Sequence, residues 1–414
     1  MESASGPGSN DLPPQRGIPD GHRRFEPWVR SDLADDVMSA LSLNAFEMKT
    51  VEHSPGKDAE AVSSAFQEAR EFNKRGLFIG GCPKSGTTLL LALLDNHPQL
   101  VVLPEETFYL EDRRIYLALK NHQARLRRLL EKTDLRLLAK GRFEGAPYAD
   151  SADARDYTGF DYNRFVALAE ELVNRPWMND SLLFSEIIRA YGMVLGGDWR
   201  NCVRWVEKST SNEVRAEALE ELFPDARLVQ VVRDPRAVFA SRKKRLMNHY
   251  GCHTKAHRLV REWNRSYQEI PRLRRDPSRF LVIRYEDLVR NAKDVMQAVC
   301  RLGGFDFIEG MLQPTRAGEG WQGNSAFQEA FNGVTAGPVD QWKGYLTEHE
   351  IWWIELHCRK GMELANYPLQ TNGRFSLMRW LKRLPGESWT GYIRARRASV
   401  CQWLGLLKEC RYDK

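Results

Sequence analysis

The sequence lacks several features that would place it in other classes of protein. No segment approaches the ~20 consecutive apolar residues that cross a bilayer. Residues 1–17 are polar and contain no apolar segment of the secretory type. The seven cysteines in the 414 residues include no Cys-x-x-Cys pair, so a disulfide framework is not indicated. We therefore expect a cytoplasmic protein with reduced cysteines.

The sequence also has little excess charge outside its C-terminal segment. Its formal net charge is +6, but residues 371–414 alone contain ten basic and three acidic residues. Because the rest is nearly neutral, attraction to polyanions belongs to this segment, and we expect no nucleic-acid partner. The segment alternates arginines with aromatic and aliphatic residues, which suits peripheral contact with a membrane surface or a helix packed on the protein. We favour the packed helix.

What is present is the composition of a globular protein, 42% hydrophobic and 28% charged. Residues 1–30, rich in Gly, Pro, Ser and Arg, are typical of a disordered arm. Residues 31–75 show helical spacing of apolar side chains over 31–43 and 58–74, which predicts a helical lead-in. We assign residues 76–370 to one large domain and residues 371–414 to the basic amphipathic C-terminal segment.

Short apolar segments typical of buried strands alternate with helical patterns in this domain. The expected strands are 77–81, 203–207, 227–232 and 280–285, and helices are expected at 213–222 and 292–302. This alternation predicts an α/β fold of three layers, with a central parallel sheet and ligands bound beyond the carboxyl ends of the strands. Residues 111–200 are expected to be a helix-rich insertion.

A phosphate-binding loop is indicated where the first strand meets a helix. Backbone N–H groups and a helix N-terminus surround one concavity there, which suits a phosphate. The lysine precedes the glycine of P-K-S-G-T-T-L, unlike in the nucleoside-triphosphate pattern G-x-x-x-x-G-K-[ST]. This segment resembles the 5′-phosphosulfate loop of sulfotransferases that use 3′-phosphoadenosine 5′-phosphosulfate (PAPS). The loop residues that we expect to bind the cofactor are Lys84, Ser85, Gly86, Thr87 and Thr88.

A second resemblance lies far away in the chain, in R-L-V-Q-V-V-R-D-P-R-A-V-F-A-S-R-K-K-R. The resemblance implies that Arg233 and Ser241 bind the 3′-phosphate of the cofactor. A guanidinium fork suits a phosphate monoester, and a hydroxyl near a helix N-terminus adds a donor. Taken singly, the segment would be a surface loop with solvated arginines.

Three shorter segments extend the resemblance over about residues 76–346. W-V-E-K-S-T resembles a segment whose lysine is Lys208, with a threonine where proline is commoner. Y-E-D-L resembles a segment whose tyrosine, Tyr285, lies near the adenosine. N-S-A-F and Q-W-K, with Ser325 and Lys343, resemble the segment that closes over the cofactor. The chain is thus similar to PAPS-dependent sulfotransferases of bacterial type, nearest the branch with tyrosylprotein and carbohydrate enzymes.

The resemblance implies transfer of a sulfuryl group from PAPS to a hydroxyl or amine acceptor. Lys84 and Lys208 would stabilise the leaving phosphate, and the chemistry requires no metal. A glutamate would be the general base. The register of E-E-T favours Glu106, whereas ungapped counting from the loop lysine favours Glu105; we prefer Glu106. The other glutamate would then be solvated and cap the next helix.

Some alternatives stay open at this stage. A P-loop kinase is disfavoured by the lysine position and by the pair for a 3′-phosphate, which ATP lacks, and a non-catalytic nucleotide-binding protein is disfavoured by the retained glutamate. The acceptor could be a saccharide, lipid, phenol or peptide tyrosine. His249, His253 and His257 recur every fourth residue, but we expect them to line the acceptor cleft or be solvated rather than to bind a metal. His97 is expected to cap or pack.

Overall fold

The computed structural model describes residues 57–143, 155–196, 199–250, 256–321, 323, 327 and 333–371. The expected arm (1–30), the helix at 31–43, the basic C-terminal segment beyond residue 371, and Ser325 lie outside these residues. The helix expected at 58–74 is confirmed as α2, Lys57–Asn73. The described residues from Ser63 onward belong to one compact unit.

The central sheet of this unit has five parallel strands in the order β2-β5-β1-β6-β7. This arrangement confirms the expected α/β class. Because β1 lies between strands that come later in the chain, the strand order reverses beside it, and the connections leave a crevice at its carboxyl end. The strands are β1 (Gly76–Gly80), β2 (Leu100–Val102), β5 (Arg204–Lys208), β6 (Arg227–Val232) and β7 (Phe280–Arg284).

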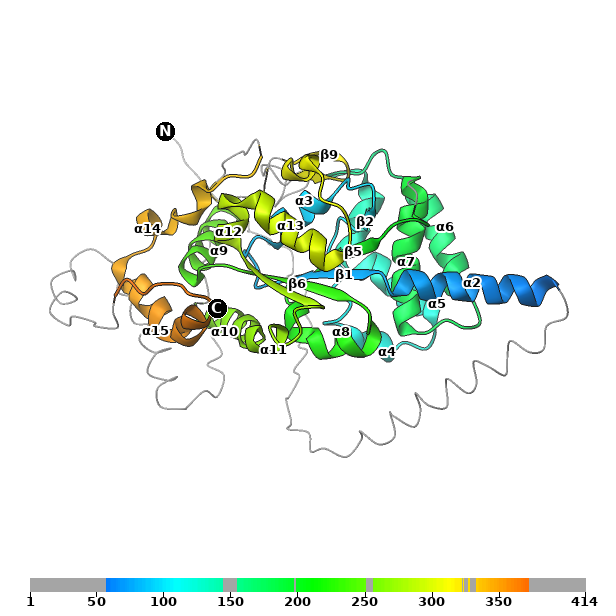
Figure 1. Cartoon of the computed structure of the whole chain (residues 1–414), viewed down its shortest axis with the longest axis horizontal. Helices are drawn as coiled ribbons and strands as arrows, with labels where there is room; N and C mark the ends of the chain where they lie inside the picture. The colour runs from blue at the N-terminus through cyan, green and yellow to red at the C-terminus, as the bar shows by residue number, and fades with distance from the viewer. Residues whose placement is uncertain are drawn as a thin grey trace, which may run out of the picture. The chain divides into compact units, whose positions relative to one another are not determined.

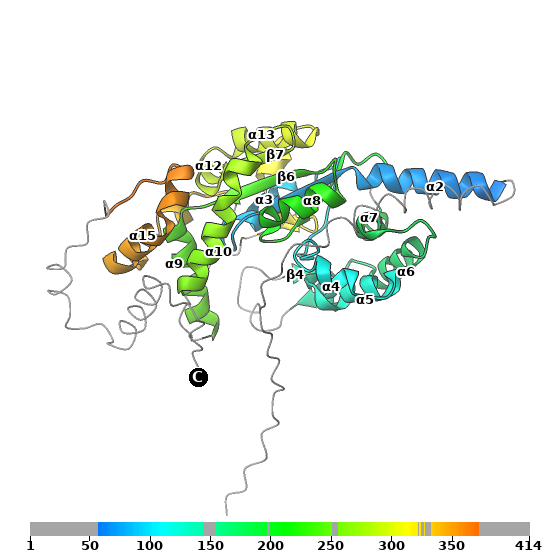
Figure 2. The ribbon, with the colours of Figure 1, turned by 90° about the horizontal axis from the view of Figure 1, so that it is seen from below.

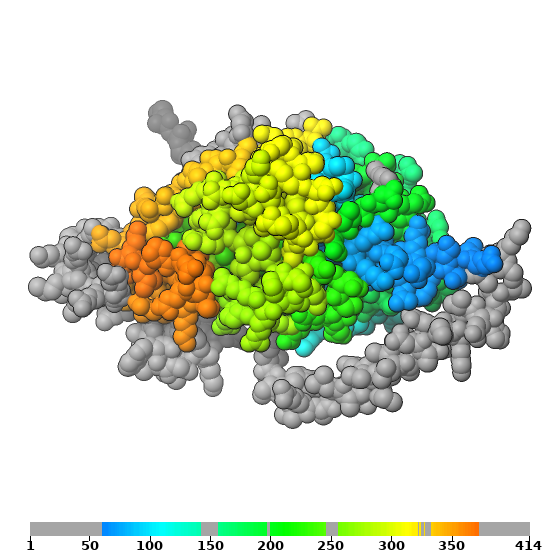
Figure 3. Space-filling model, viewed as in Figure 1, coloured from blue at the N-terminus to red at the C-terminus, as the bar shows by residue number. Residues whose placement is uncertain are grey.

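Helices cover both faces of the sheet (Figure 1). One face carries α3 (Thr87–Leu94), α12 (Tyr285–Arg290) and α13 (Ala292–Gly303), and the other carries α8 (Ala216–Leu222), α10 (Ala256–Gln268) and α11 (Ile270–Leu273). In the space-filling view the segment from α10 to α13 forms the centre of the visible face (Figure 3). The expected helix at 292–302 is confirmed, whereas that at 213–222 begins as a 3₁₀ turn, Asn212–Arg215, before α8.

The expected helix-rich insertion is confirmed between β2 and β5. Its helices gather in one group beside the sheet, and α9 and α10 lie in another with α15 (Figure 2). Side-chain oxygens of Asn121, Asp161 and Asn179 cap α5, α6 and α7, as expected where such residues precede an apolar pattern. The bounds are α4 Arg113–Leu117, α5 His122–Lys132, η1 Asp134–Lys140, α6 Tyr162–Val173, α7 Asp180–Leu195, α9 Pro235–Tyr250 and α15 Glu348–Leu364.

Short elements complete the described chain near the carboxyl ends of the strands. Two antiparallel pairs join β3 to β4 and β8 to β9. No helix in the described ranges is long and apolar enough to cross a membrane. Four cysteines, Cys82, Cys202, Cys300 and Cys358, are described, and each is buried and outside any disulfide bond. The bounds are β3 Arg142–Phe143, β4 Arg155–Asp156, η3 Glu309–Leu312, β8 Thr315–Arg316, β9 Glu319–Gly320, η4 Gly337–Val339 and α14 Trp342–Tyr345.

Two clusters of the apolar core pack against the sheet on the sides of the crevice. The first joins the strands to α3 and α13 through side chains such as Ile79, Leu90, Val229 and Val299. The second joins the end of β6 to α9, α10 and α15 and contains the stacked rings of Trp263 and Tyr267. The two clusters meet at the end of β6, where Val231 belongs to the first and Val232 to the second. The next residue is Arg233, for which the sequence predicted a phosphate contact.

Candidate active site

The loop between β1 and α3 is a tight turn built on left-handed backbone. Gly81, Lys84 and Gly86 have φ of 149°, 75° and 95°. A Cβ on Gly81 would lie 2.4 Å from the carbonyl oxygen of Val231, so only glycine fits there. Lys84 adopts this left-handed conformation although it is unfavourable for residues other than glycine, and such residues keep it only where the surrounding structure imposes it. The strained lysine therefore stands at the point where the loop faces the pocket.

A pocket of about 340 Å³ opens at the carboxyl ends of β1, β5 and β6. Six cationic and three acidic side chains line it, which suits a ligand with several negative charges. The cations are Lys84, Lys208, Arg233, Arg242, Arg245 and Arg316, and the carboxylates are Glu105, Glu106 and Asp134. Of the expected site residues, Gly86, Thr87, Thr88, Ser241 and Tyr285 also line it.

Glu106 and Lys208 form an ion pair in this pocket. The Lys208 ammonium group donates to Glu106 and lies 3.4 Å from the Thr88 hydroxyl. The Thr210 hydroxyl donates to the other oxygen of Glu106 at 3.4 Å. One carboxylate and one ammonium group thus meet beside the first turn of α3, within the same pocket as the phosphate loop.

Glu105 has different partners from its neighbour. It accepts hydrogen bonds from the Tyr157 hydroxyl and, at 2.9 Å, from Arg316. Its side chain is 1% exposed, against 18% for that of Glu106. The expectation that the second glutamate would be solvated and cap a helix is therefore wrong: burial against a cation and a phenol fixes it instead.

A buried carboxylate that sequence reasoning missed anchors the loop containing Glu106. Glu207 accepts hydrogen bonds from the hydroxyls of Thr107 and Ser209 at 2.7 and 2.5 Å and from Asn212 at 2.8 Å. The Ser209 hydroxyl accepts from the backbone N–H groups of Thr107 and Phe108. Burial raises the pKa of Glu207, and these hydrogen bonds counter part of the rise. Hydrogen bonds to Glu207 and Ser209, at the end of β5, therefore fix the segment that follows Glu106.

Arg233, Tyr285 and Gly86 form a stack at the other side of the pocket. The guanidinium carbon lies 4.1 Å from the tyrosine ring centroid, and a Cβ on Gly86 would lie 2.4 Å from that ring. Arg233 donates to the carbonyl oxygens of Lys84 and Pro338 at 2.9 and 3.2 Å. Its Nε is buried without a hydrogen-bond partner among the described residues, which leaves it one unused donor.

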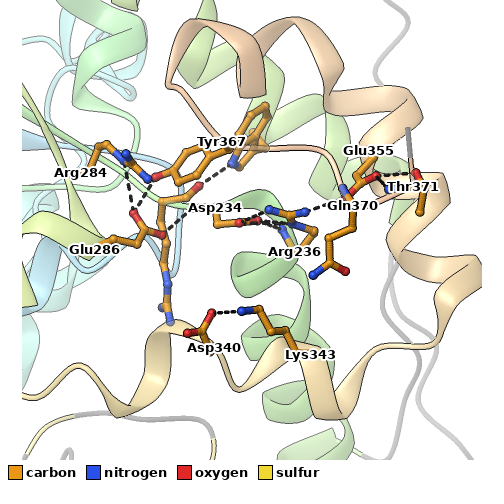
Figure 4. Close-up of polar contacts among 12 residues, drawn as sticks. Asp234, Arg236, Arg284, Glu286, Asp340, Lys343, Glu355, Tyr367, Gln370 and Thr371 are labelled. Carbon is orange, nitrogen blue, oxygen red and sulfur yellow. Dashed lines mark hydrogen bonds and ion pairs between the residues drawn. The ribbon is translucent and has the colours of Figure 1, made fainter. Parts of the chain in front are cut away.

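Not every expected residue faces the pocket. The Ser85 hydroxyl is buried without a partner among the described residues, and Ser85 is not among those that line the pocket. Lys343 forms an ion pair with Asp340 at 2.8 Å, and its side chain is half exposed (Figure 4). It does not line the pocket either, so its role toward the cofactor stays a prediction.

Of the histidines singled out in the sequence, His97 is buried and packs as expected, whereas His257 is exposed. His97 is hydrogen-bonded to the carbonyl of Asp306 at 2.9 Å, and burial lowers its pKa. The side chains of His249 and His253 lie outside the description, and His257 is not a lining residue. No group of three or more His, Cys, Asp or Glu placed to hold a metal ion occurs among the described residues.

Three arginines of the pocket were missed as site residues. Arg242 and Arg245 follow Ser241 on α9, in the run R-K-K-R. The available signal was the spacing of Arg245, which comes four residues after that serine and lies on the same face of the helix. Arg316 comes from the β8–β9 hairpin, and no local pattern indicates that it reaches Glu105.

The fold and the pocket together define an α/β protein with a largely cationic pocket that also contains carboxylates. The profile described as "Sulfotransferase family" matches residues 76–309. This is more than half of the chain, and the protein belongs to the sulfotransferase family, a family of enzymes.

The chain is also similar to several known sulfotransferases. The protein-tyrosine sulfotransferase of Drosophila melanogaster is 27% identical over 228 residues, which are 54% of this chain and 37% of that protein. The match therefore spans little more than a third of the relative. A sulfotransferase domain from the curacin biosynthetic pathway has a TM-score of 0.45 and 23% identity, over 71% of this chain and 98% of that domain. A mouse sulfotransferase in complex with PAP (3′-phosphoadenosine 5′-phosphate) has a TM-score of 0.35 and 11% identity, over 72% of this chain and 92% of that chain.

Proposed function

We propose that this enzyme transfers the sulfuryl group of PAPS to a hydroxyl or amine of an acceptor, and releases 3′-phosphoadenosine 5′-phosphate (PAP). The observation that carries the proposal is one pocket lined both by the loop lysine with Glu106 and Lys208 and by Arg233 with Ser241. PAPS has two anionic ends, a 5′-phosphosulfate and a 3′-phosphate. Two separate cationic groups in one pocket suit such a ligand better than one with a single anionic end.

The residues present fit the cosubstrate. The Arg233 guanidinium has an unused buried donor, and the loop before α3 offers backbone N–H groups at a helix N-terminus. Tyr285 presents an aromatic ring beside both. Arg233 and Ser241 would hold the 3′-phosphate, and Lys84 and Thr87 would hold the 5′ end.

The catalytic roles follow from where charge develops. Glu106 would accept the proton of the acceptor hydroxyl while the acceptor oxygen bonds to sulfur. Lys84 and Lys208 would stabilise the oxygen that retains the electron pair of the broken sulfur–oxygen bond, and this charge would favour the transition state over the ground state. The chemistry is close to phosphoryl transfer, in which positioning and neutralisation dominate.

The acceptor class remains open among saccharides, lipids, phenols and peptide tyrosines. A kinase reaction is the rival, and the pocket disfavours it because the arginine and serine suit a 3′-phosphate that ATP lacks. Thermal denaturation separates the two. At 100 times its dissociation constant, a ligand of the folded state stabilises by about 2.7 kcal/mol.

We expect PAP to raise the melting temperature far more than ADP or ATP with magnesium. Preferential stabilisation by magnesium ATP would overturn the proposal. Labelled PAPS with one acceptor from each of the four classes then tests transfer directly. Arg233→Ala is the matched control, because it should lose stabilisation by PAP without affecting that by simple anions.

A further inference from the structure

The turn that follows Arg233 is held by two buried carboxylates from distant parts of the chain (Figure 4). Glu286 accepts a hydrogen bond from the backbone N–H of Asp234 at 3.0 Å. Glu355, on α15, accepts from the Arg236 guanidinium at 2.7 Å, and Arg236 in turn pairs with Asp234 at 2.6 Å. All four side chains are buried. The turn therefore has no freedom independent of these carboxylates.

One short segment, residues 367–371, supplies further donors to both carboxylates. The Tyr367 hydroxyl donates to Glu286 at 2.7 Å. The backbone N–H groups of Gln370 and Thr371 donate to Glu355 at 2.8 and 2.9 Å, and the Thr371 hydroxyl adds a third donor. Three residues of this segment, Tyr367, Gln370 and Thr371, thus donate hydrogen bonds to the two carboxylates.

The charge balance shows why this segment matters. Asp234 and Glu355 pair with Arg236, whereas the nearest cation to Glu286 in these pairs is Arg284, at the longer distance of 3.9 Å. A buried carboxylate without donors is costly. Burial alone would raise the pKa of Glu355, but hydrogen bonds from Thr371 and Gln370 and the charge of Arg236 bring it below its ordinary value. The segment supplies donors that the cations do not.

The same network sets the direction of the peptide between Arg233 and Asp234. Its carbonyl oxygen accepts from Trp263 at 3.1 Å and from Tyr267 at 2.8 Å, while its N–H donates to Glu286. A peptide held on both sides has one orientation. That orientation determines where the Arg233 side chain leaves the backbone.

We propose that residues 367–371 are a positioning element for recognition of the 3′-phosphate, acting on Arg233 through Glu286 and Glu355. The inference rests on the proposed function, because it takes Arg233 as the ligand of that phosphate. The segment lies beyond residues 76–309, which match the family. Its last residue, Thr371, is also the first residue of the basic C-terminal segment, residues 371–414. The proposed phosphate site is therefore connected, through Glu355, to the start of that segment.

The test compares PAP with adenosine 5′-phosphate, which lacks the 3′-phosphate, by calorimetry on the full chain. Tyr367→Phe and Thr371→Val each remove one hydroxyl donor. We expect each to raise the dissociation constant of PAP about 3- to 10-fold, the range of one hydrogen bond. That of adenosine 5′-phosphate should change less than about twofold. Turnover at saturating PAPS should be unchanged, with the effect confined to KM.

Two further variants separate positioning from general stability. Thr347→Val removes the cap at the other end of α15 and should lower the melting temperature without changing the ratio of the two dissociation constants. Thr371→Ser keeps the hydroxyl and should restore the wild-type ratio. If Tyr367→Phe does not fold, the Thr371 pair decides alone.

The outcomes distinguish this inference from the proposed function. A wild-type protein that binds PAP no more tightly than adenosine 5′-phosphate would overturn the proposed function, and the inference with it. A wild-type protein that prefers PAP, with variants that keep the full preference, would overturn the inference only.

Discussion

Glu105 and Glu106 are neighbours in the chain, but their side chains have opposite surroundings. Glu105 is enclosed by Arg316 and Tyr157, and Glu106 faces the pocket and pairs with Lys208. The Glu105 carboxylate therefore has a structural role, because it is buried against these two partners. The arrangement of Glu106 leaves a carboxylate beside the phosphate loop, where a general base is needed.

Replacement of each glutamate by glutamine should therefore have different effects. Glu106→Gln keeps the size of the side chain but removes its basicity, so turnover should fall about 10²- to 10⁴-fold while stabilisation by PAP is retained. Glu105→Gln should retain most turnover and lower the melting temperature, because Arg316 loses its counter-charge. Rates with labelled PAPS and thermal denaturation measure both effects. The reverse result would assign the base to Glu105.

Arg233→Ala and Lys84→Ala should separate binding from chemistry. Loss of the guanidinium should weaken binding of PAP by about 1.5–3 kcal/mol, the range for a charged hydrogen bond. Loss of the lysine should chiefly lower turnover, because its charge meets the leaving oxygen as the bond breaks. Calorimetry with PAP and steady-state kinetics distinguish the two. Unchanged turnover in Lys84→Ala would contradict the assigned role.

Gly86→Ala tests the stack beneath Arg233. The new methyl group would meet the Tyr285 ring at 2.4 Å, in addition to the strain of φ 95°. Gly196→Ala is the matched control, since that glycine has φ 74° and no atom within 4 Å of its added Cβ. Strain alone should cost about 1–2 kcal/mol, so the control should lower the free energy of unfolding by this amount. Gly86→Ala should lower it further and abolish binding of PAP; equal losses would show that the stack is not required.

Glu213 should make stability depend on pH. Its carboxylate lies against Gly80 at the start of the phosphate loop, and burial raises its pKa from 4.5 to about 6. A raised pKa contributes stability that is fully present below pH 4.5 and lost as the pH rises through about 6. The loss amounts to about 2 kcal/mol. Glu213→Gln should remove this part of the pH dependence in urea denaturation between pH 4 and 8; an unchanged profile would exclude Glu213 as its source.

The elements with strong local patterns were predictable from the sequence. β6 has the expected bounds, β1 and β5 are each shifted by one residue at both ends, and β7 ends one residue earlier than expected. β2 was missed because its three residues, Leu100–Val102, are too short to show a period. Its place at the sheet edge comes from pairing with β5, which is distant in the chain.

The candidate site was predictable where its residues belong to continuous motifs. Lys84, Arg233 and Tyr285 stand in segments that carry their own signal, and all three line the pocket. The environment of Glu105 was not predictable, because Arg316 is distant in the chain. Lys343 matched a motif, but its local neighbour Asp340 pairs with it. Motifs thus located the groups, and only the folded chain assigned their partners.

The position of β1 in the middle of the sheet has a consequence for how the chain is made. The strand leaves the ribosome first, but Gly76 pairs with Trp205 and Leu77 with Arg227. Until those residues have been synthesised, both edges of β1 are unpaired and the apolar α3 that follows it has no sheet to cover. Open edges of this kind are sites of aggregation. Chaperones that bind nascent apolar segments should therefore engage residues 76–94 first and release them only after β6 is complete.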